Sequence, residues 1–188
     1  MLVKVQRHKT AIGRPALSLP AKLLFQSGLV TDETSVLDYG CGRGDDVKFL
    51  KELGIPAVGW DPHFIPDPAL LVPHDIVNLG FVLNVIEDPA ERQTVLTDAY
   101  ALTNKCLSVS VMLHSQNDTV TSIPHRDGQL TAKKTFQKYY EQIELEELIS
   151  NQLSASPIAA APGVFFIFKD ETLEQDFLLK RQLGIIQD

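Results

Sequence analysis

The chain has 188 residues, of which 44% are hydrophobic and 22% charged, and its formal net charge is −7. These values are ordinary for one globular domain over residues 1–188, and the acidic balance argues against a surface that binds nucleic acid throughout. With no apolar run long enough to span a membrane, and only Cys41 and Cys106 far apart in the sequence, we predict a cytoplasmic protein without a metal site or a membrane partner.

The first thirty residues differ in charge from the rest of the chain, because residues 1–30 carry lysines and arginines but no acid. They predict a basic N-terminal arm followed by a leading helix from Ala21 to about Gln26, capped by Ser18. Such an arm could bind nucleic-acid phosphate or could dock onto the acidic body, and the sequence leaves both interpretations open.

A glycine-rich turn follows the first predicted strand. Residues 36–39 are apolar enough for a buried strand, Gly40, Gly42 and Gly44 come at alternate positions, and a helix is expected over Val47–Leu53. A second short strand, Ala57–Trp60, ends at Asp61. A glycine turn followed by a strand-end acid is the layout by which α/β sheets hold adenosine-type ligands, with the acid on the ribose hydroxyls.

The spacing of the glycines distinguishes two ligand classes. A dinucleotide fingerprint needs a third glycine where this chain has Asp45, and a carboxylate there would repel a pyrophosphate. An NAD-binding oxidoreductase is therefore the disfavoured alternative. Leu37-Asp38-Tyr39-Gly40-Cys41-Gly42-Arg43-Gly44 resembles motif I of class I methyltransferases that use S-adenosylmethionine (SAM). That resemblance implies a Rossmann-like α/β fold, a mostly parallel sheet with a C-terminal antiparallel strand, helices on both faces, and SAM as cofactor.

The segments after Asp61 predict the middle of such a sheet. Prolines crowd residues 62–73, so we expect a sheet trimmed at its third strand, with a Pro-rich loop closing over the adenine side. A buried strand is expected from Asp75, with Asn78-Leu79-Gly80 as its exit. Asp88 would cap a helix from Ala90 to about Thr103, and Cys106–Leu113 would form the next strand.

The C-terminal third is expected to close the sheet. His114–Lys134 is polar and predicts a long loop, and Thr135 would cap a helix continuing to about Asn151. Ala155–Ala160 and Gly163–Phe168 predict an antiparallel hairpin, and Glu171–Leu183 a final helix.

The resemblance implies a donor site at the strand ends. Asp61 would hold the ribose, residues 40–44 would line the methionine half, and the exit of the third parallel strand would border the transfer site. Cys41 is expected to be structural, since no base lies beside it in the sequence. The expected cofactor-binding residues are Asp38, Gly40, Cys41, Gly42, Gly44, Asp61, Pro62, Asn78, Leu79 and Gly80.

The methyl acceptor is not readable from a motif. The strand exit reads Asn78-Leu79-Gly80-Phe81 and lacks the Asn/Asp-Pro-Pro-aromatic motif of nucleic-acid amino methyltransferases, and the histidines lack metal-ligand spacing. Candidate catalytic or acceptor-side residues are His8, Lys9, Arg14 and Tyr139. Packing of the arm, and a core stripe for the tyrosine, are the competing interpretations.

Several segments together resemble the methyltransferases associated with DNA phosphorothioation systems. They are Arg7–Arg14, Asp38–Asp46, Gly59–Pro62, Asn78–Pro89, Thr135–Tyr140 and Ala161–Phe165. The resemblance implies a SAM-dependent methyltransferase linked to DNA modification, with DNA-modification proteins as partners. Nucleic acid at the basic arm is the partner that the charge of the arm allows. The alternative is a non-catalytic SAM-binding or scaffold module of a DNA-modification complex.

Overall fold

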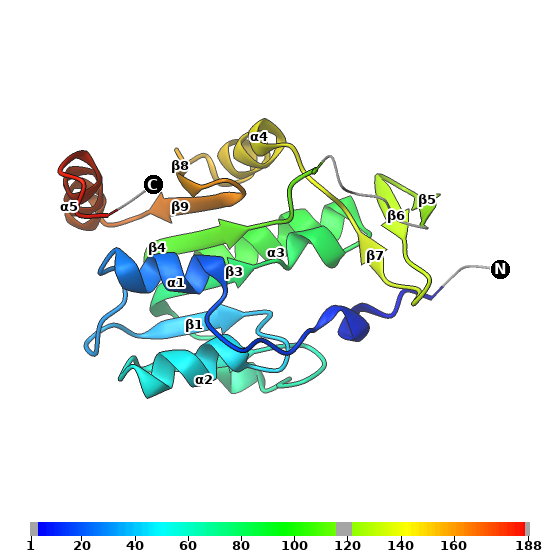
Figure 1. Cartoon of the computed structure of the whole chain (residues 1–188), viewed down its shortest axis with the longest axis horizontal. Coiled ribbons are helices and arrows are strands. Elements are labelled where there is room, and N and C mark those ends of the chain that lie inside the picture. Colours follow the sequence, from blue (N-terminus) through cyan, green and yellow to red (C-terminus); the bar gives the residue numbers. More distant parts are fainter. Residues whose placement is uncertain (1–3, 116–121, 187–188) are drawn as a thin grey trace.

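The computed structural model describes residues 4–115 and 122–186, which form a mixed α/β fold. A six-stranded sheet has the strand order β2–β1–β3–β4–β9–β8 (Figure 1). The first four strands in this order, β2, β1, β3 and β4, are parallel, whereas β9 runs antiparallel to β4 and to β8. This confirms the expected mostly parallel sheet with a C-terminal antiparallel strand. Its strands are β1 (Val36–Tyr39), β2 (Ala57–Trp60), β3 (His74–Gly80), β4 (Thr103–Ser110), β8 (Ile158–Ala161) and β9 (Val164–Phe168).

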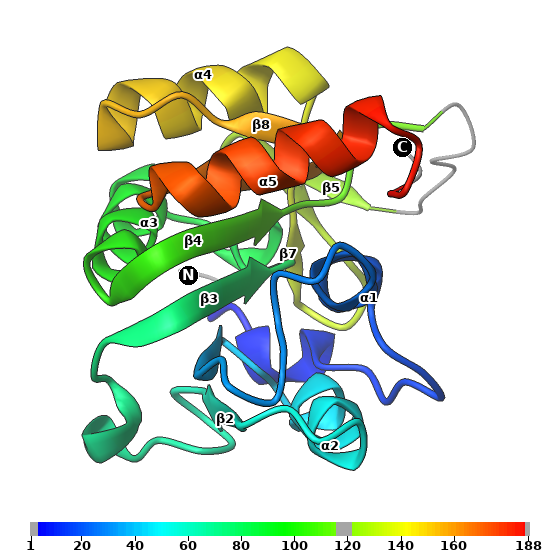
Figure 2. The ribbon, with the colours of Figure 1, turned by 90° about the vertical axis from the view of Figure 1, so that its left-hand side faces the viewer.

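Helices cover both faces of this sheet, as predicted (Figure 2). Alternating residues of each strand point to opposite faces, so Val36 packs with α1, α2 and α5, whereas Leu37 packs with α3 and α4. Both strand residues are fully buried. The helices are α1 (Leu19–Gln26), α2 (Asp45–Glu52), α3 (Pro89–Ala101), α4 (Gln142–Leu153) and α5 (Glu171–Gln182).

The sheet ends at β2, so the expected trimming of the third strand is confirmed in the described chain. After β2, Asp61 makes a single antiparallel bridge with Ile65, and a short 3₁₀ helix, η2 (Pro68–Leu70), follows. The prolines of this interval remove backbone donors that a further strand would need. The chain then enters β3 directly.

The helix predicted from Thr135 is wrong at its start. Phe136–Gln137 instead forms strand β7 of a second, three-stranded sheet with β5 (Ile123–His125) and β6 (Gly128–Leu130). Phe136 is fully buried in register with Leu130 and therefore serves a strand. Helix α4 begins later because a capping box formed by Glu141 and Glu144 satisfies its first backbone donors.

Other boundaries shift by a few residues. The long loop predicted over His114–Lys134 contains β5 and β6, and its residues 116–121 lie outside the described residues. The polar segment before the leading helix forms a 3₁₀ turn, η1 (Arg7–Thr10), and another, η3 (Leu83–Val85), follows β3. β4 runs from Thr103 to Ser110, so it begins and ends three residues earlier than the predicted strand Cys106–Leu113.

None of the helices in the described ranges is long and apolar enough to cross a bilayer.

Candidate functional site

A cavity of about 870 Å³ lies at the carboxyl ends of β1, β2 and β3. Its volume falls near the upper end of the range of about 300–1,000 Å³ usual for small-molecule sites. It also lies where ligands bind in open α/β sheets. The cavity therefore has the place and the size of a ligand site.

The roof of this cavity consists of two segments far apart in the sequence, the arm (Arg7–Arg14) and the loop Thr131–Thr135. The backbone N–H of Gln6 donates to the carbonyl of Lys134 at 2.8 Å, which joins the two segments. Both segments contribute residues to the cavity wall. Figure 1 shows the arm passing the arrowheads of the strands beside the segment that leads into β7.

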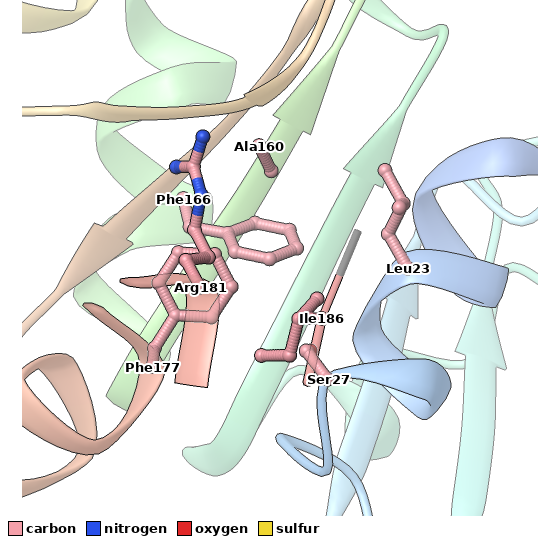
Figure 3. Close-up of a pocket in the computed structure, with 7 residues that line it drawn as sticks. All are labelled: Leu23, Ser27, Ala160, Phe166, Phe177, Arg181 and Ile186. Carbon is pink, nitrogen blue, oxygen red and sulfur yellow. The ribbon is translucent and has the colours of Figure 1, made fainter. Parts of the chain in front are cut away.

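A second hollow, between α1 and α5, has no such capacity (Figure 3). Its volume is about 10 Å³, which is room for at most one water molecule. Phe166, Phe177 and Ile186 line it, and all three belong to the buried core. It is a small packing gap between α1, α5 and the sheet.

The glycine turn has the geometry that the motif predicts. Gly40 and Gly42 adopt φ values of +78° and +56°, where a side chain is strained. A Cβ on Gly40 would lie 2.5 Å from Val82, and one on Gly42 would lie 3.2 Å from Ala11 of the arm. The bare backbone thus lets the arm and the segment after β3 approach the turn closely.

Asp61 holds this turn in place. Its carboxylate accepts the N–H of Gly42 at 3.0 Å, and also the N–H groups of His63 at 2.8 Å and Phe64 at 2.9 Å. One acid therefore fixes both the glycine turn after β1 and the loop after β2. A carboxylate can accept about four hydrogen bonds, so one acceptor position is left for a ligand.

Asp38 and Asn78 form a buried polar pair on adjacent strands. They face each other in register, and Asn78 Nδ2 donates to Asp38 Oδ1 at 3.1 Å. Burial raises the pKa of Asp38 to about 7, the nearby Asp46 charge adds to that rise, and the bond from Asn78 opposes it. The charge of this carboxyl therefore changes near neutral pH, which makes it responsive to a cation placed beside it.

The arm is docked onto the body through ionic and polar contacts. Arg7 donates to both carboxylate oxygens of Glu91 and also to Glu87. These bonds raise the pKa of Arg7 above its ordinary value, and the bonds to Glu91 contribute most. The backbone N–H of Arg14 donates to Asp45 at 2.7 Å, and Ser18 donates twice to Asp46. The acids that follow the glycine turn thus anchor the arm.

Two histidines join the arm to the loop after β2. The rings of His8 and His63 stack with centroids 4.4 Å apart, and both residues line the cavity. This contact brings a predicted acceptor-side residue next to the segment that follows Asp61.

The exit of β3 carries an unusual backbone. Asn78, Leu79 and Gly80 belong to the strand itself, not to a loop, and the chain turns at Phe81 with φ of +57°. A bulky residue in that region is strained, and such strain concentrates at ligand sites. The guanidinium of Arg14 lies over the Phe81 ring, 5.4 Å from its centroid.

Most of the predicted donor-site residues lie together in the wall of the cavity. Gly44 and Leu79 do not: Gly44 is the N-cap of α2, and Leu79 is fully buried in the core on the α3 side. The residues that line the cavity are Asp38, Gly40, Cys41, Gly42, Asp61, Pro62, Asn78 and Gly80.

The predicted acceptor-side residues divide in the same way. His8, Lys9 and Arg14 line the cavity, whereas Tyr139 is outside its wall, with its ring 5.9 Å from that of His114. The sequence reasoning missed Phe81, Val82 and the loop Thr131–Thr135. The aromatic residue directly after the strand-end glycine was the available signal for Phe81.

Metal and thiol chemistry have no support in the described residues. The described ranges contain no group of three or more His, Cys, Asp and Glu that could hold a metal ion. Burial raises the pKa of Cys41 to about 12, and the charges of Asp38 and Asp61 add to the effect. Since the thiolate is the nucleophilic form, Cys41 is unsuited to attack a substrate.

Comparison with solved structures identifies the fold. The 1,6-didemethyltoxoflavin-N1-methyltransferase of Burkholderia thailandensis, solved with 1,6-didemethyltoxoflavin and S-adenosylhomocysteine (SAH), matches with a TM-score of 0.56 at 19% identity, over 80% of this chain and 79% of that one. A SAM-dependent methyltransferase from Aquifex aeolicus gives a TM-score of 0.54 at 16% identity, over 88% and 98%.

A third structure, an amino pentose methyltransferase from Micromonospora echinaspora with bound SAM, gives a TM-score of 0.53 at 11% identity, over 81% of this chain and 89% of that one. No protein-family model and no curated protein sequence matches the chain. At these identities the likeness establishes a shared fold: the chain has the Rossmann-like fold of class I methyltransferases.

Proposed function

We propose that the protein is a SAM-dependent methyltransferase that holds its donor in the cavity at the carboxyl ends of β1–β3. The observation that carries this proposal is the glycine turn, fixed by Asp61 and open to a cavity of about 870 Å³. The three solved structures described above are methyltransferases, and two of them contain SAM or SAH.

The residues in the wall fit the parts of SAM. Asp61 has one acceptor position left for a ribose hydroxyl, and the bare backbone of Gly40 and Gly42 admits the methionine half. Asp38, whose pKa of about 7 lets it ionise beside a cation, suits the ammonium group. Asn78 and Gly80 border the place of transfer at the end of β3.

The chemistry asks mainly for alignment. SAM, when bound, supplies a methyl group already activated by its sulfonium. The protein contributes by holding donor and acceptor in line and by excluding water, which the roof does by covering the cavity. The turn fixed by Asp61 and the strained exit at Phe81 give this geometry rigid supports.

A non-catalytic SAM-binding or scaffold module is the second candidate. One observation favours it: the β3 exit, Asn78-Leu79-Gly80-Phe81, has no acceptor motif. A role with DNA-modification proteins, phosphorothioation systems included, stays a prediction from the sequence resemblance. Binding of nucleic acid by the arm also stays a prediction, and Arg7 is already engaged by Glu87 and Glu91.

Methyl transfer distinguishes the two candidates. The protein is incubated with methyl-labelled SAM and with DNA, tRNA or a small-molecule cell extract, and the label is followed. An enzyme transfers label to one of these pools, whereas a scaffold transfers none.

Two glycine variants serve as a matched pair in this assay. Gly42→Ala should abolish transfer, because a Cβ there meets the arm. Gly54→Ala is the control: its φ is +81°, its Cβ would meet nothing within 4 Å, and it lies outside the cavity wall. Equal transfer by both variants would contradict the assigned donor site.

A further inference from the structure

The charges around the cavity are unevenly distributed. Five acids line it, and each one is already bonded within the protein: Asp38 by Asn78, Asp45 by the N–H of Arg14, Asp46 by Ser18, Asp61 by three backbone N–H groups and Glu91 by Arg7. Four of these acids lie on β1, after β2 or at the start of α2. The donor side of the cavity therefore carries most of its acids, although Arg43 of the glycine turn also lines it.

The roof carries three cations that form no ion pair within residues 4–115 and 122–186, although the charge of Arg14 reaches Asp38 and opposes the rise of its pKa. Lys9 and Arg14 come from the arm and Lys133 from the loop Thr131–Thr135, and all three line the cavity. None of them forms an ion pair with any residue of the described chain, unlike Arg7. The bond between Gln6 and Lys134 joins the two segments that carry these cations.

Part of the same cavity wall is apolar. Phe81, Val82, Val85 and Met112 line the cavity where β3 and β4 end. Arg14 reaches from the arm to this apolar part of the wall, since its guanidinium lies over the Phe81 ring. A ligand here would meet both apolar side chains and cations that form no ion pair within the described residues.

We propose that the methyl acceptor is a small organic anion with an apolar body. Its carboxylate or phosphate is held by Arg14, Lys9 and Lys133 beside Phe81, while a different atom of the molecule takes the methyl group from the sulfonium and SAH leaves. The inference rests on the proposed function. The sulfonium of the donor adds a positive charge beside this site, which strengthens the attraction for an anion. The roof, fastened at Gln6 and Arg7, covers a space suited to a small molecule and not to a duplex.

A binding experiment without turnover tests the charge preference. The protein, with and without saturating SAH, is titrated calorimetrically with benzoate, phenyl phosphate, benzamide and benzylamine. At least one of the two anions should bind at least tenfold more tightly than neutral benzamide, and benzylamine should bind more weakly still. The two anions distinguish a carboxylate from a phosphate. Benzamide or benzylamine binding as tightly as the better anion would overturn the proposal.

Variants assign the preference to the roof. Arg14→Gln and the double variant Lys9→Gln, Lys133→Gln should each weaken the better anion at least fivefold, while SAH affinity changes less than twofold. Lys22→Gln, an exposed lysine of α1 outside the cavity, is the matched control. The anion assignment of Arg14 is overturned if Arg14→Gln weakens SAH but not 5′-methylthioadenosine, which lacks the amino-acid group. Arg14 would then hold the donor carboxylate.

A transfer experiment follows the product itself. With labelled SAM and a cell extract, the label should appear in small molecules that an anion exchanger retains, and Lys9→Gln, Lys133→Gln should raise KM for that fraction more than it lowers kcat. Label in DNA, in tRNA or in neutral small molecules would overturn the inference. Absence of SAH binding would contradict the proposed function and not the charge preference. The two failures are distinguishable because the anions are also titrated without SAH.

Discussion

Replacing Asp61 tests the geometry of the glycine turn directly. In the native protein its carboxylate accepts three backbone N–H groups, those of Gly42, His63 and Phe64. Asp61→Ala removes all three bonds. The amide of Asp61→Asn can still accept from His63 and Phe64 through its oxygen, but its NH₂ group would then face the N–H of Gly42.

The expected magnitudes follow from these bonds. A hydrogen bond to a charged group contributes about 1.5–3 kcal/mol, and the exposed His63 N–H can turn to water instead. Discounting for partial exposure, we expect Asp61→Ala to lower the free energy of unfolding by about 2–4 kcal/mol and Asp61→Asn by about 1–2 kcal/mol. Both should weaken SAM at least tenfold, since the turn is no longer fixed.

Urea unfolding and SAM calorimetry measure these effects on the same samples. Asp67→Ala is the matched control, because Asp67 accepts a single exposed N–H, that of Ala69, in the same loop and outside the cavity. It should cost about 0.5–1 kcal/mol, as loss of a cap does, and should leave SAM affinity unchanged. Asp61 variants that match Asp67→Ala in both measurements would refute the assigned role of Asp61.

Three further predictions concern the turn, the buried acid and the arm. Gly40→Ala should lower the unfolding free energy in urea by about 1–3 kcal/mol through strain at positive φ, and adding Val82→Ala should recover only the part due to the 2.5 Å contact. Burial raises the pKa of Asp38 to about 7, so its stabilising contribution is complete below pH 4 and is lost as the pH rises through 7. Asp38→Asn removes this titration. The variant should therefore flatten the change in unfolding free energy between pH 4 and 8 by on the order of 4 kcal/mol. A native pH dependence in that variant would contradict the assignment. Arg7→Gln should change stability by less than about 1 kcal/mol, since Arg7 is 36% exposed, but should speed trypsin cleavage at Lys9; an unchanged cleavage rate would show that the ion pairs do not hold the arm.

The sequence was most informative where one local pattern determines the structure. Residues 36–45 predicted strand, glycine turn and helix, because positive φ at Gly40 and Gly42 has few other solutions. Asp61 was also predicted at the site. Its bond to the Gly42 N–H was not, because that contact joins two strand ends that are adjacent only in the folded sheet.

The roof was the part that local patterns could not predict. The pairing of Arg7 with Glu91 and the bond between Gln6 and Lys134 join segments distant in sequence. The apolar residues near Phe136 have a spacing that suits a helix as well as a strand, and pairing with β6 across the short connection Thr131–Thr135 favours the strand. Tyr139 was therefore wrongly placed on a helix.

Calorimetric titration of the purified protein with SAM tests the central claim most directly, with NAD and Asp61→Ala as comparisons. We predict that one SAM binds per chain, that SAH competes for the same site, that Asp61→Ala binds at least tenfold more weakly and that NAD gives no binding heat. Folded protein that binds neither SAM nor SAH, or that binds NAD in their place, would contradict the account.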